Sequence, residues 1–350
     1  MLAELSDRIR AAHAAKTPLR IRGGGSKDWY GGPLSGEILD VSVHRGIVSY
    51  EPGELVLTAK SGTPLAEIED LLEQHGQMLA FEPPHFGATA TLGGALACAF
   101  AGPRRAYAGS ARDMVLGTRL IDGRGQTLTF GGQVMKNVAG YDVSRLMVGA
   151  LGTLGVILEA SLKVLPKPFT ELTLRFEMDE ADAILKMNQW SALPFPLSAS
   201  AWVGGALMLR LSGAQTAVRA AHEKLGGEVH EHGAQFWRAA REQSAAFFSA
   251  NDLPLWRLSV PAACPPLALP GRQALTWGGA QRWLKSDAAP NVIRSIVATA
   301  GGHATLFRGG DKSAGVFHPL PESLMKYHRR LKARFDPAGI LNRGRFYRDF

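Results

Sequence analysis

Arg22-Gly23-Gly24-Gly25-Ser26-Lys27 is the stretch that says most about the fold of this 350-residue chain. It follows Pro18–Arg22, a short run that predicts a β-strand. Successive glycines expose their backbone N–H groups, which can then converge on an anion such as a pyrophosphate. Ser26 could add a hydroxyl and Lys27 a charge. Taken alone, a glycine triplet is more often a flexible turn, and this one matches neither the Walker A spacing nor the GxGxxG fingerprint.

Two further glycine-rich segments follow. Thr91-Leu92-Gly93-Gly94 opens a predicted helix of small residues, and the segment continues to Gly102-Pro103-Arg104. A Gly-Gly pair at a helix start permits close backbone approach to a ligand and offers the helix N-terminus to negative charge. In Gly149–Ile157, glycines interrupt a helix-to-strand transition. Tight packing alone is an alternative for each segment, so their joint order and spacing are the informative feature.

Composition limits the class of protein. Apolar residues make up 46% and charged residues 20%, as in an ordinary globular protein, and the length suggests two domains, one of them interrupted by the other. The net charge of +8 supports attraction to anions but does not by itself indicate nucleic acid, and no nucleic-acid partner is expected. Cys98 and Cys264 form no CxxC pair. We therefore expect no cysteine-ligated iron–sulfur or zinc site in this chain, and a reducing compartment.

The two ends of the chain suggest its location. The N-terminus has no signal-type apolar run, and no stretch reaches ~18 uninterrupted apolar residues. A cytoplasmic protein without a membrane span is expected. Peripheral association with the inner face of the cytoplasmic membrane, through a complex, is an open alternative.

Near the C-terminus, a basic run is either a solvated helix face or a docking surface for an acidic partner. Its cations are Lys326, Arg329, Arg330, Lys332, Arg334, Arg343, Arg345 and Arg348.

The pattern of elements predicts an interrupted first domain. Thr63 is expected as the N-cap of a helix whose first turn holds Pro64. Residues 114–130 predict a β-hairpin around Asp122–Gly125. Pro166 and Pro168 mark a boundary, after which strands and helices alternate as in an open α+β sheet. We therefore expect domains over residues 1–168 and 169–310, and a C-terminal segment, 311–350, that returns to the first domain through a helix at 322–335.

Four blocks, in order, carry a resemblance: IRGGGSKDWYG (residues 21–31), TLGGALA with GPRRAYAGSARD (91–113), VMKNVAGYDVSRLMVGALGTLGVI (134–157) and FDPAGILNRGRFY (335–347). With them the chain resembles the FAD-binding flavoproteins typified by vanillyl-alcohol oxidase and para-cresol methylhydroxylase. Within that family it looks most like the FAD-binding subunits of bacterial glycolate oxidases. The resemblance covers residues 1–168 and 320–350 well and the middle poorly.

The resemblance implies an α+β fold with FAD stretched between two subdomains and an inserted α+β cap domain over the isoalloxazine ring. The first glycine segment would hold the pyrophosphate, the second would line the cofactor toward the flavin, and the third would contact the adenine. Because the first segment has no histidine, non-covalent FAD is expected. The residues implied to bind FAD are Arg22, Gly23, Gly24, Gly25, Ser26, Lys27, Pro83, Thr91, Leu92, Gly93, Gly94, Gly102, Arg104, Gly152, Gly155, Val156, Ile157 and Asn342.

The chain also departs from that family. Relatives that oxidise D-2-hydroxy acids usually carry a metal-binding motif like PGHxGDGNxH, which is missing here, so no metal is expected. Cys98–Gly102 replaces a polar segment of catalytic relatives, and Leu151 replaces their glutamate. Of the ten histidines, only His230 and His232 are spaced by two, and a surface pair is the simpler explanation.

Several residues keep two interpretations. Lys136 and Asn137, with Tyr141-Asp142, could face the flavin and a substrate carboxylate, or form a structural loop. Arg104 and Arg105 could clamp a phosphate, or be exposed loop arginines. Cys98 is expected to be an unreactive core residue.

The resemblance implies an FAD-dependent oxidoreductase acting on CH–OH groups, as one subunit of a glycolate dehydrogenase complex. A sister FAD subunit would take most of the hydride from the 2-hydroxy acid, and electrons would pass to an iron–sulfur subunit. A self-sufficient flavin dehydrogenase of another hydroxy acid or alcohol, and a scaffold subunit with degenerate flavin binding, remain alternatives.

Overall fold

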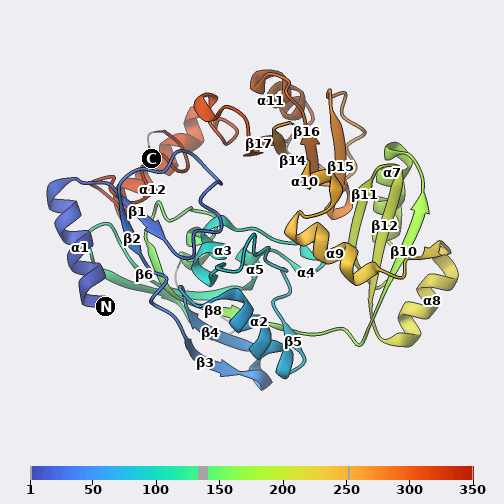
Figure 1. The fold of residues 1–350 in the computed structure, drawn as a ribbon, viewed down its shortest axis with the longest axis horizontal. Coiled ribbons are helices and arrows are strands. Elements are labelled where there is room, and N and C mark those ends of the chain that lie inside the picture. The colour runs from blue at the N-terminus through green and yellow to red at the C-terminus, as the bar shows by residue number, and fades with distance from the viewer. Residues whose placement is uncertain (1, 133–140, 251–252, 349) are drawn as a thin grey trace.

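The first glycine segment leaves the carboxyl end of a small parallel sheet. In a computed structural model that describes residues 2–132, 141–250, 253–348 and 350, strand β1 (Leu19–Arg22) pairs in parallel with β2 (Glu37–Asp40). Helix α1 (Leu2–Ala15) packs on this pair, and the C-terminal segment adds a parallel bridge between Leu341 and Leu19. The two ends of the chain therefore lie beside each other, as the blue and red ribbons of Figure 1 show.

A five-stranded antiparallel sheet forms the centre of the first part of the molecule, residues 2–166. Its order is β3 (Ile47–Glu51), β4 (Val56–Lys60), β8 (Val156–Lys163), β6 (Val115–Ile121) and β7 (Thr127–Gly131). The central strand β8 is buried on both faces, because Val156 and Leu158 pack toward α1 while Ile157, Ala160 and Leu162 pack toward α2 (Leu65–Gln74) and α3 (Leu92–Cys98). Shorter elements complete this part: β5 (Gln77–Met78), which pairs with β9 (Leu165–Pro166), and helices α4 (Arg105–Ala108), α5 (Ala111–Met114) and α6 (Ser144–Met147).

The sequence-based elements of this half compare well with the structure, with one correction. The hairpin expected at 114–130 is confirmed as β6 and β7. Thr63, expected as an N-cap, does not cap α2; Pro64 occupies that position and its side chain makes no capping hydrogen bond. The Thr63 hydroxyl instead bonds to the backbone N–H and C=O of Gly46, at 2.9 and 3.2 Å. The Thr63 hydroxyl, which the local pattern predicted to cap the helix, therefore makes a tertiary contact with Gly46 instead.

Residues 170–308 contain an eight-stranded antiparallel sheet, drawn beside the first part in Figure 1. Its order is β13 (Glu228–Val229), β10 (Thr170–Glu177), β12 (Ala206–Gly213), β11 (Leu197–Val203), β15 (Arg272–Thr276), β16 (Gln281–Lys285), β14 (Leu255–Ser259) and β17 (His303–Arg308). Helices α7 (Glu180–Ser191), α8 (Gln215–Leu225), α9 (Gly233–Glu242), α10 (Ala246–Ser249) and α11 (Pro290–Thr299) accompany it, and α12 (Glu322–Phe335) leads back to the first part. The exact domain limits, 1–168, 169–310 and 311–350, stay a prediction.

An aromatic cluster joins the two parts. Trp29, Tyr30 and Phe100 of the first part lie against Phe307 of β17, with ring centroids 5.1, 5.5 and 5.4 Å from that ring.

Within the described ranges, no helix is both long and apolar enough to span a lipid bilayer.

Candidate cofactor site

A cavity opens directly over the first glycine segment. It holds about 560 Å³ of space, part of it open to solvent, between the end of β1, helix α3 and the C-terminal segment. Its walls combine residues from both ends of the sequence. They are Ile21, Arg22, Gly23, Gly24, Gly25, Ser26, Lys27, Asp28, Leu34, Thr91, Gly94, Ala97, Cys98, Leu151, Asn342 and Arg345.

The backbone of the glycine segment has unused hydrogen-bond donors. Among the described residues, no acceptor binds the amides of Gly24, Gly25, Ser26 and Lys27, whereas the amides of Asp28 and Tyr30 bond to Gly25 O and Lys27 O, both at 3.1 Å. Gly25 has a φ of +73°, which places consecutive amides in a concave arrangement that suits an anion. These amides line the wall of the cavity, so an anionic group of a ligand can satisfy them.

Close backbone contact explains the first two glycines. A Cβ at Gly24 would lie 1.5 Å from the carbonyl oxygen of Thr89, and one at Gly23 would lie 2.6 Å from Thr91 Oγ1. The Thr89 hydroxyl also donates to Gly24 O at 2.6 Å. The segment is therefore held against residues 89–91, and no larger side chain fits there.

Cations surround the cavity. Arg20 and Arg22 both bind the carboxylate of Asp28, with Arg22 Nε at 3.0 Å. The buried Lys27 ammonium donates to His85 O at 3.0 Å, and burial lowers its pKa. Among the described residues that line the cavity, Asp28 is the one carboxylate, so the electrostatic potential there favours an anion.

Two further cations stabilise residues 28–32, which follow the glycine segment. Arg345, which is buried, donates to the carbonyls of Asp28, Tyr30 and Gly32, the last at 2.6 Å. Lys312 donates to the carbonyls of Trp29 and Gly31. Five consecutive carbonyls, residues 28–32, are thus satisfied by two side chains from distant parts of the chain. From the sequence, Arg345 was expected only as one cation of the C-terminal basic run and Asp28 had no expected role, although both lie inside the blocks that carry the resemblance.

The second glycine segment is used differently. The amides of Leu92 and Gly93 bond to Thr63 O and Ser61 O at 2.9 and 2.7 Å, and that of Gly94 bonds to the N-cap Thr91 Oγ1 at 3.3 Å. A Cβ at Gly93 would lie 2.7 Å from Ser61 Cβ. Thr91 and Gly94 reach the cavity, while Leu92 is buried in the core and the half-buried Gly93 packs against Ser61.

The third segment lies mostly outside the cavity. Gly155 packs against Leu120 and Ile121, and Val156 and Ile157 point into the two opposite cores of β8. Asn342, with a φ of +44°, joins Leu151 and β1. Its Nδ2 donates to Leu151 O at 2.6 Å and its Oδ1 accepts from Ile21 N–H at 2.7 Å. It lines the cavity as a structural link, with Gly152 in contact with its amide group.

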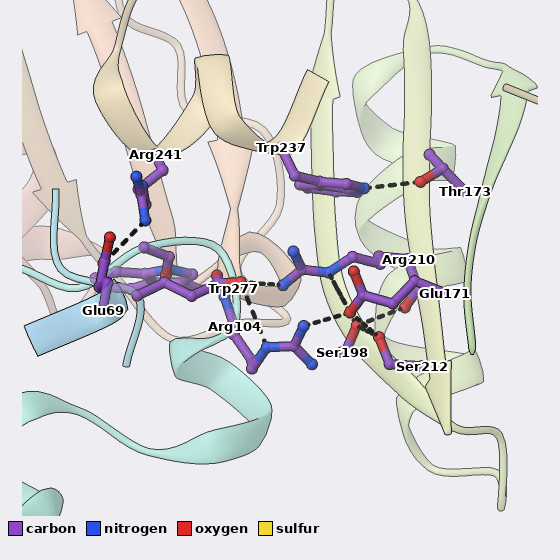
Figure 2. Close-up of polar contacts among 12 residues, drawn as sticks. Glu69, Arg104, Glu171, Thr173, Ser198, Arg210, Ser212, Trp237, Arg241 and Trp277 are labelled. Carbon is purple, nitrogen blue, oxygen red and sulfur yellow. Dashed lines mark hydrogen bonds and ion pairs between the residues drawn. The ribbon is translucent and has the colours of Figure 1, made fainter. Parts of the chain in front are cut away.

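Arg104 lies in a buried ion cluster rather than at the cavity (Figure 2). It contacts Glu82 at 3.4 Å and pairs with Glu171 of β10, while Arg210 of β12 reaches Glu82 at 2.9 Å. Although burial alone would raise it, Arg210, Ser212 and Arg104 hold the pKa of Glu171 below its ordinary value. The cluster thus links the loop before α4 to the eight-stranded sheet.

The neighbours of Arg104 that were expected at the cofactor also do not line this cavity. The Arg105 guanidinium lies over the Trp277 ring, 4.4 Å from its centroid, so neither arginine is placed as a phosphate clamp. Gly102 lines a second cavity, and Pro83 is buried beside Glu82.

The remaining candidates are distributed as follows. Tyr141 is 94% exposed, and Lys136 and Asn137 lie outside the described residues. Cys98, expected in the core, lines the cavity at the end of α3; burial raises the pKa of its thiol to about 11. His230 and His232 lie near each other, with ring centroids 6.4 Å apart, and the described ranges contain no group of three or more potential metal ligands.

Comparisons with known proteins agree on the fold and its cofactor. The sequence model of a family described as FAD binding domain matches residues 2–131. Glycolate oxidase subunit GlcE of Escherichia coli (strain K12) is 52% identical over 343 residues, 98% of this chain and 96% of the relative. Glycolate oxidase subunit GlcD of Bacillus subtilis (strain 168) is 31% identical over 183 residues, 51% of this chain and 38% of the relative. A solved structure of alkyldihydroxyacetonephosphate synthase matches with a TM-score of 0.66 at 16% identity, over 97% of this chain and 75% of that one, which shows a shared fold.

Proposed function

The chain belongs to the family of the FAD-binding glycolate oxidase subunit GlcE, and from this we propose that it is the FAD-binding subunit of a glycolate oxidase complex. It has the expected α+β fold of that family, and its cofactor is FAD. Its relatives are oxidoreductases acting on CH–OH groups, and the chain is an enzyme subunit of that class.

One observation carries the assignment of the site. The amides of Gly24–Lys27 have no acceptor among the described residues, and they line a cavity surrounded by cations. Buried or half-buried amides of this kind call for an acceptor, and a pyrophosphate supplies several charged oxygens. We place the FAD pyrophosphate on this segment, bound without a covalent link, with Ser26, Thr91 and Gly94 in the adjoining wall.

FAD, when bound, supplies the acceptor for two electrons from a CH–OH group. This chain's residues bind and orient the cofactor: the glycine segment holds the diphosphate, while Arg345 and Lys312 keep residues 28–32 in place. The sequence lacks the metal-binding motif of relatives that oxidise 2-hydroxy acids themselves. This favours hydride removal from glycolate mostly on a sister FAD subunit, with electrons passed on to an iron–sulfur subunit of a cytoplasmic complex.

The test is flavin binding by the purified full chain, with Gly94→Val as the probe. Gly94 lines the cavity, and a Cβ there would meet only the Thr91 hydroxyl within 4 Å, at 3.3 Å, so a small shift of that side chain makes room for the substitution. Released cofactor, identified chromatographically, should be FAD. We expect FAD affinity to fall at least about tenfold in the variant, a loss of about 1.4 kcal/mol, with little change in the unfolding temperature.

Gly53→Ala is the matched control, because a Cβ at Gly53 meets nothing within 4 Å. It should bind FAD like the unmodified chain. A colourless chain that does not bind added FAD would contradict the proposal and favour a scaffold role. Fast glycolate turnover by the isolated chain with an artificial acceptor would instead favour a self-sufficient dehydrogenase.

A further inference from the structure

A second cavity lies where the first part of the molecule meets the eight-stranded sheet. It holds about 450 Å³ of space, part of it open to solvent. Phe86 and Phe100 come from loops of the first part, and Trp283 comes from β16. Its polar groups are mainly on the strands, and they include Arg257 of β14 and Thr276 at the end of β15.

Arg257 is the exceptional group in this cavity. Its guanidinium lies 5.8 Å from the ring centroids of Tyr30 and Phe100 and 5.6 Å from that of Phe307. Its one hydrogen bond among the described residues runs from Nη2 to the Tyr30 hydroxyl, at 3.0 Å. No carboxylate of the described ranges pairs with it, so most of its five N–H donors have no acceptor among these residues.

Two other arginines near this interface have acidic partners, whereas Arg308, over the Trp29 ring, donates to the amide oxygen of Gln243 at 3.0 Å. Arg241, also in the cavity wall, pairs with Glu69 at 3.2 Å and with Glu242 at 2.8 Å. Arg210, deeper in the sheet, pairs with Glu82. Arg257 is therefore a partly buried charge among aromatic rings. A carboxylate from outside the chain would neutralise this charge and accept its free N–H groups.

The second cavity adjoins the cofactor cavity through Tyr30. The side chain of Tyr30 accepts the hydrogen bond of Arg257, and its carbonyl accepts from Arg345, which lines the first cavity. Along the chain, Cys98 lines the first cavity and Phe100 the second. A ligand on Arg257 would thus lie close to a cofactor in the first cavity.

We propose that Arg257 binds the carboxylate of a small hydroxy acid, or of the oxo acid formed from it, in this second cavity. A planar guanidinium can bind both carboxylate oxygens, and the aromatic rings beside Arg257 strengthen the interaction by lowering the local dielectric constant. Thr276 Oγ1 donates to Gln281 Oε1 at 2.8 Å, which leaves the Gln281 amide N–H groups to reach the oxygen on the second carbon. The inference rests on the proposed function for the choice of acid.

The test is calorimetric titration of the full chain with glycolate, glyoxylate, acetate and inorganic phosphate. We expect saturable binding of glycolate and glyoxylate and weaker binding of acetate and phosphate. Arg257→Met should lower glycolate affinity at least about tenfold, because a charged hydrogen-bond partner is lost. Arg257→Lys keeps the charge without the planar fork and should fall in between.

Arg238→Met, on the exposed side of α9, is the control and should bind glycolate like the unmodified chain. Circular dichroism checks folding, and if Arg257→Met does not fold, Arg257→Lys still decides the question. Absence of glycolate binding, equal binding of phosphate, or unchanged affinity in a folded Arg257 variant would overturn the inference. Flavin content measured in the same samples separates the two proposals: FAD without glycolate binding overturns only this inference, and glycolate binding without FAD overturns only the cofactor assignment.

Discussion

The two glycine-rich segments at Gly23–Gly25 and Gly93–Gly94 are similar in sequence but differ in what their amides bind. In the first, the amides of Gly24 and Gly25 have no acceptor within the described ranges and open onto a cavity. In the second, the amide of Gly93 bonds to Ser61 O at 2.7 Å and that of Gly94 to its own N-cap. Both segments contain glycines that no larger residue can replace without a clash. Glycine in the sequence therefore indicates a position where other atoms come close to the backbone. Whether that backbone binds a ligand or only packs depends on whether its amides already have acceptors within the protein.

The largest expected effect separates these two uses. Gly24→Ala would place a Cβ 1.5 Å from Thr89 O, so the segment must move and its amides lose their arrangement. We expect FAD affinity to fall more than about 100-fold and stability to fall by about 1–3 kcal/mol. Fluorescence titration with FAD and urea unfolding measure the two effects.

Gly93→Ala is the matched change in the second segment. Its Cβ would lie 2.7 Å from Ser61 Cβ, so it should lower stability by about 1–3 kcal/mol as an overpacked core position does. FAD affinity of the folded fraction should stay unchanged. An equal loss of FAD affinity in Gly24→Ala and Gly93→Ala would show that the two segments do not differ in their role in binding FAD.

A smaller effect is expected at Arg104, which the resemblance assigned to the cofactor and the structure places with Glu82 and Glu171. Arg104→Met removes one charge from a buried cluster, but Arg210 remains, and the Glu171 side chain is 39% exposed. We expect a loss of about 2 kcal/mol in the free energy of unfolding, with FAD affinity unchanged. If the variant has unchanged stability but binds FAD poorly, the prediction is wrong and Arg104 contributes to the cofactor site.

The smallest effect concerns pH. Burial raises the pKa of Cys98 to about 11 from 9.0, so its thiol stays protonated in the folded chain at pH values where it ionises in the unfolded chain. The contribution of this thiol to stability is therefore present below pH 9 and is lost as pH rises from about 9 to 11. Alkylation of Cys98 by iodoacetamide, followed by mass spectrometry of its peptide, should stay slow at pH 8 and accelerate toward pH 11. Fast alkylation of the folded protein at pH 8 would contradict this pKa.

Local patterns predicted many elements correctly, because periodicity and turn residues act over a few positions. The hairpin at 114–130 and the helix at 322–335 are examples. The pattern failed at Thr63, whose hydroxyl binds Gly46 from another part of the chain. It also could not show that Val156 and Ile157 point into two cores, since that depends on the position of β8 in the middle of a sheet.

The sequence by itself determined the FAD-binding family, through four ordered blocks, and the glycine segment that we assign to the pyrophosphate. Only the tertiary structure decided which amides are free, that Arg345 and Lys312 hold the carbonyls of residues 28–32, and that Arg257 lacks an acidic partner among the described residues. The physical reason is that glycine spacing is a local property of the chain. Satisfaction of a hydrogen-bond donor or a charge depends on groups up to about 300 residues away, which only folding brings into contact.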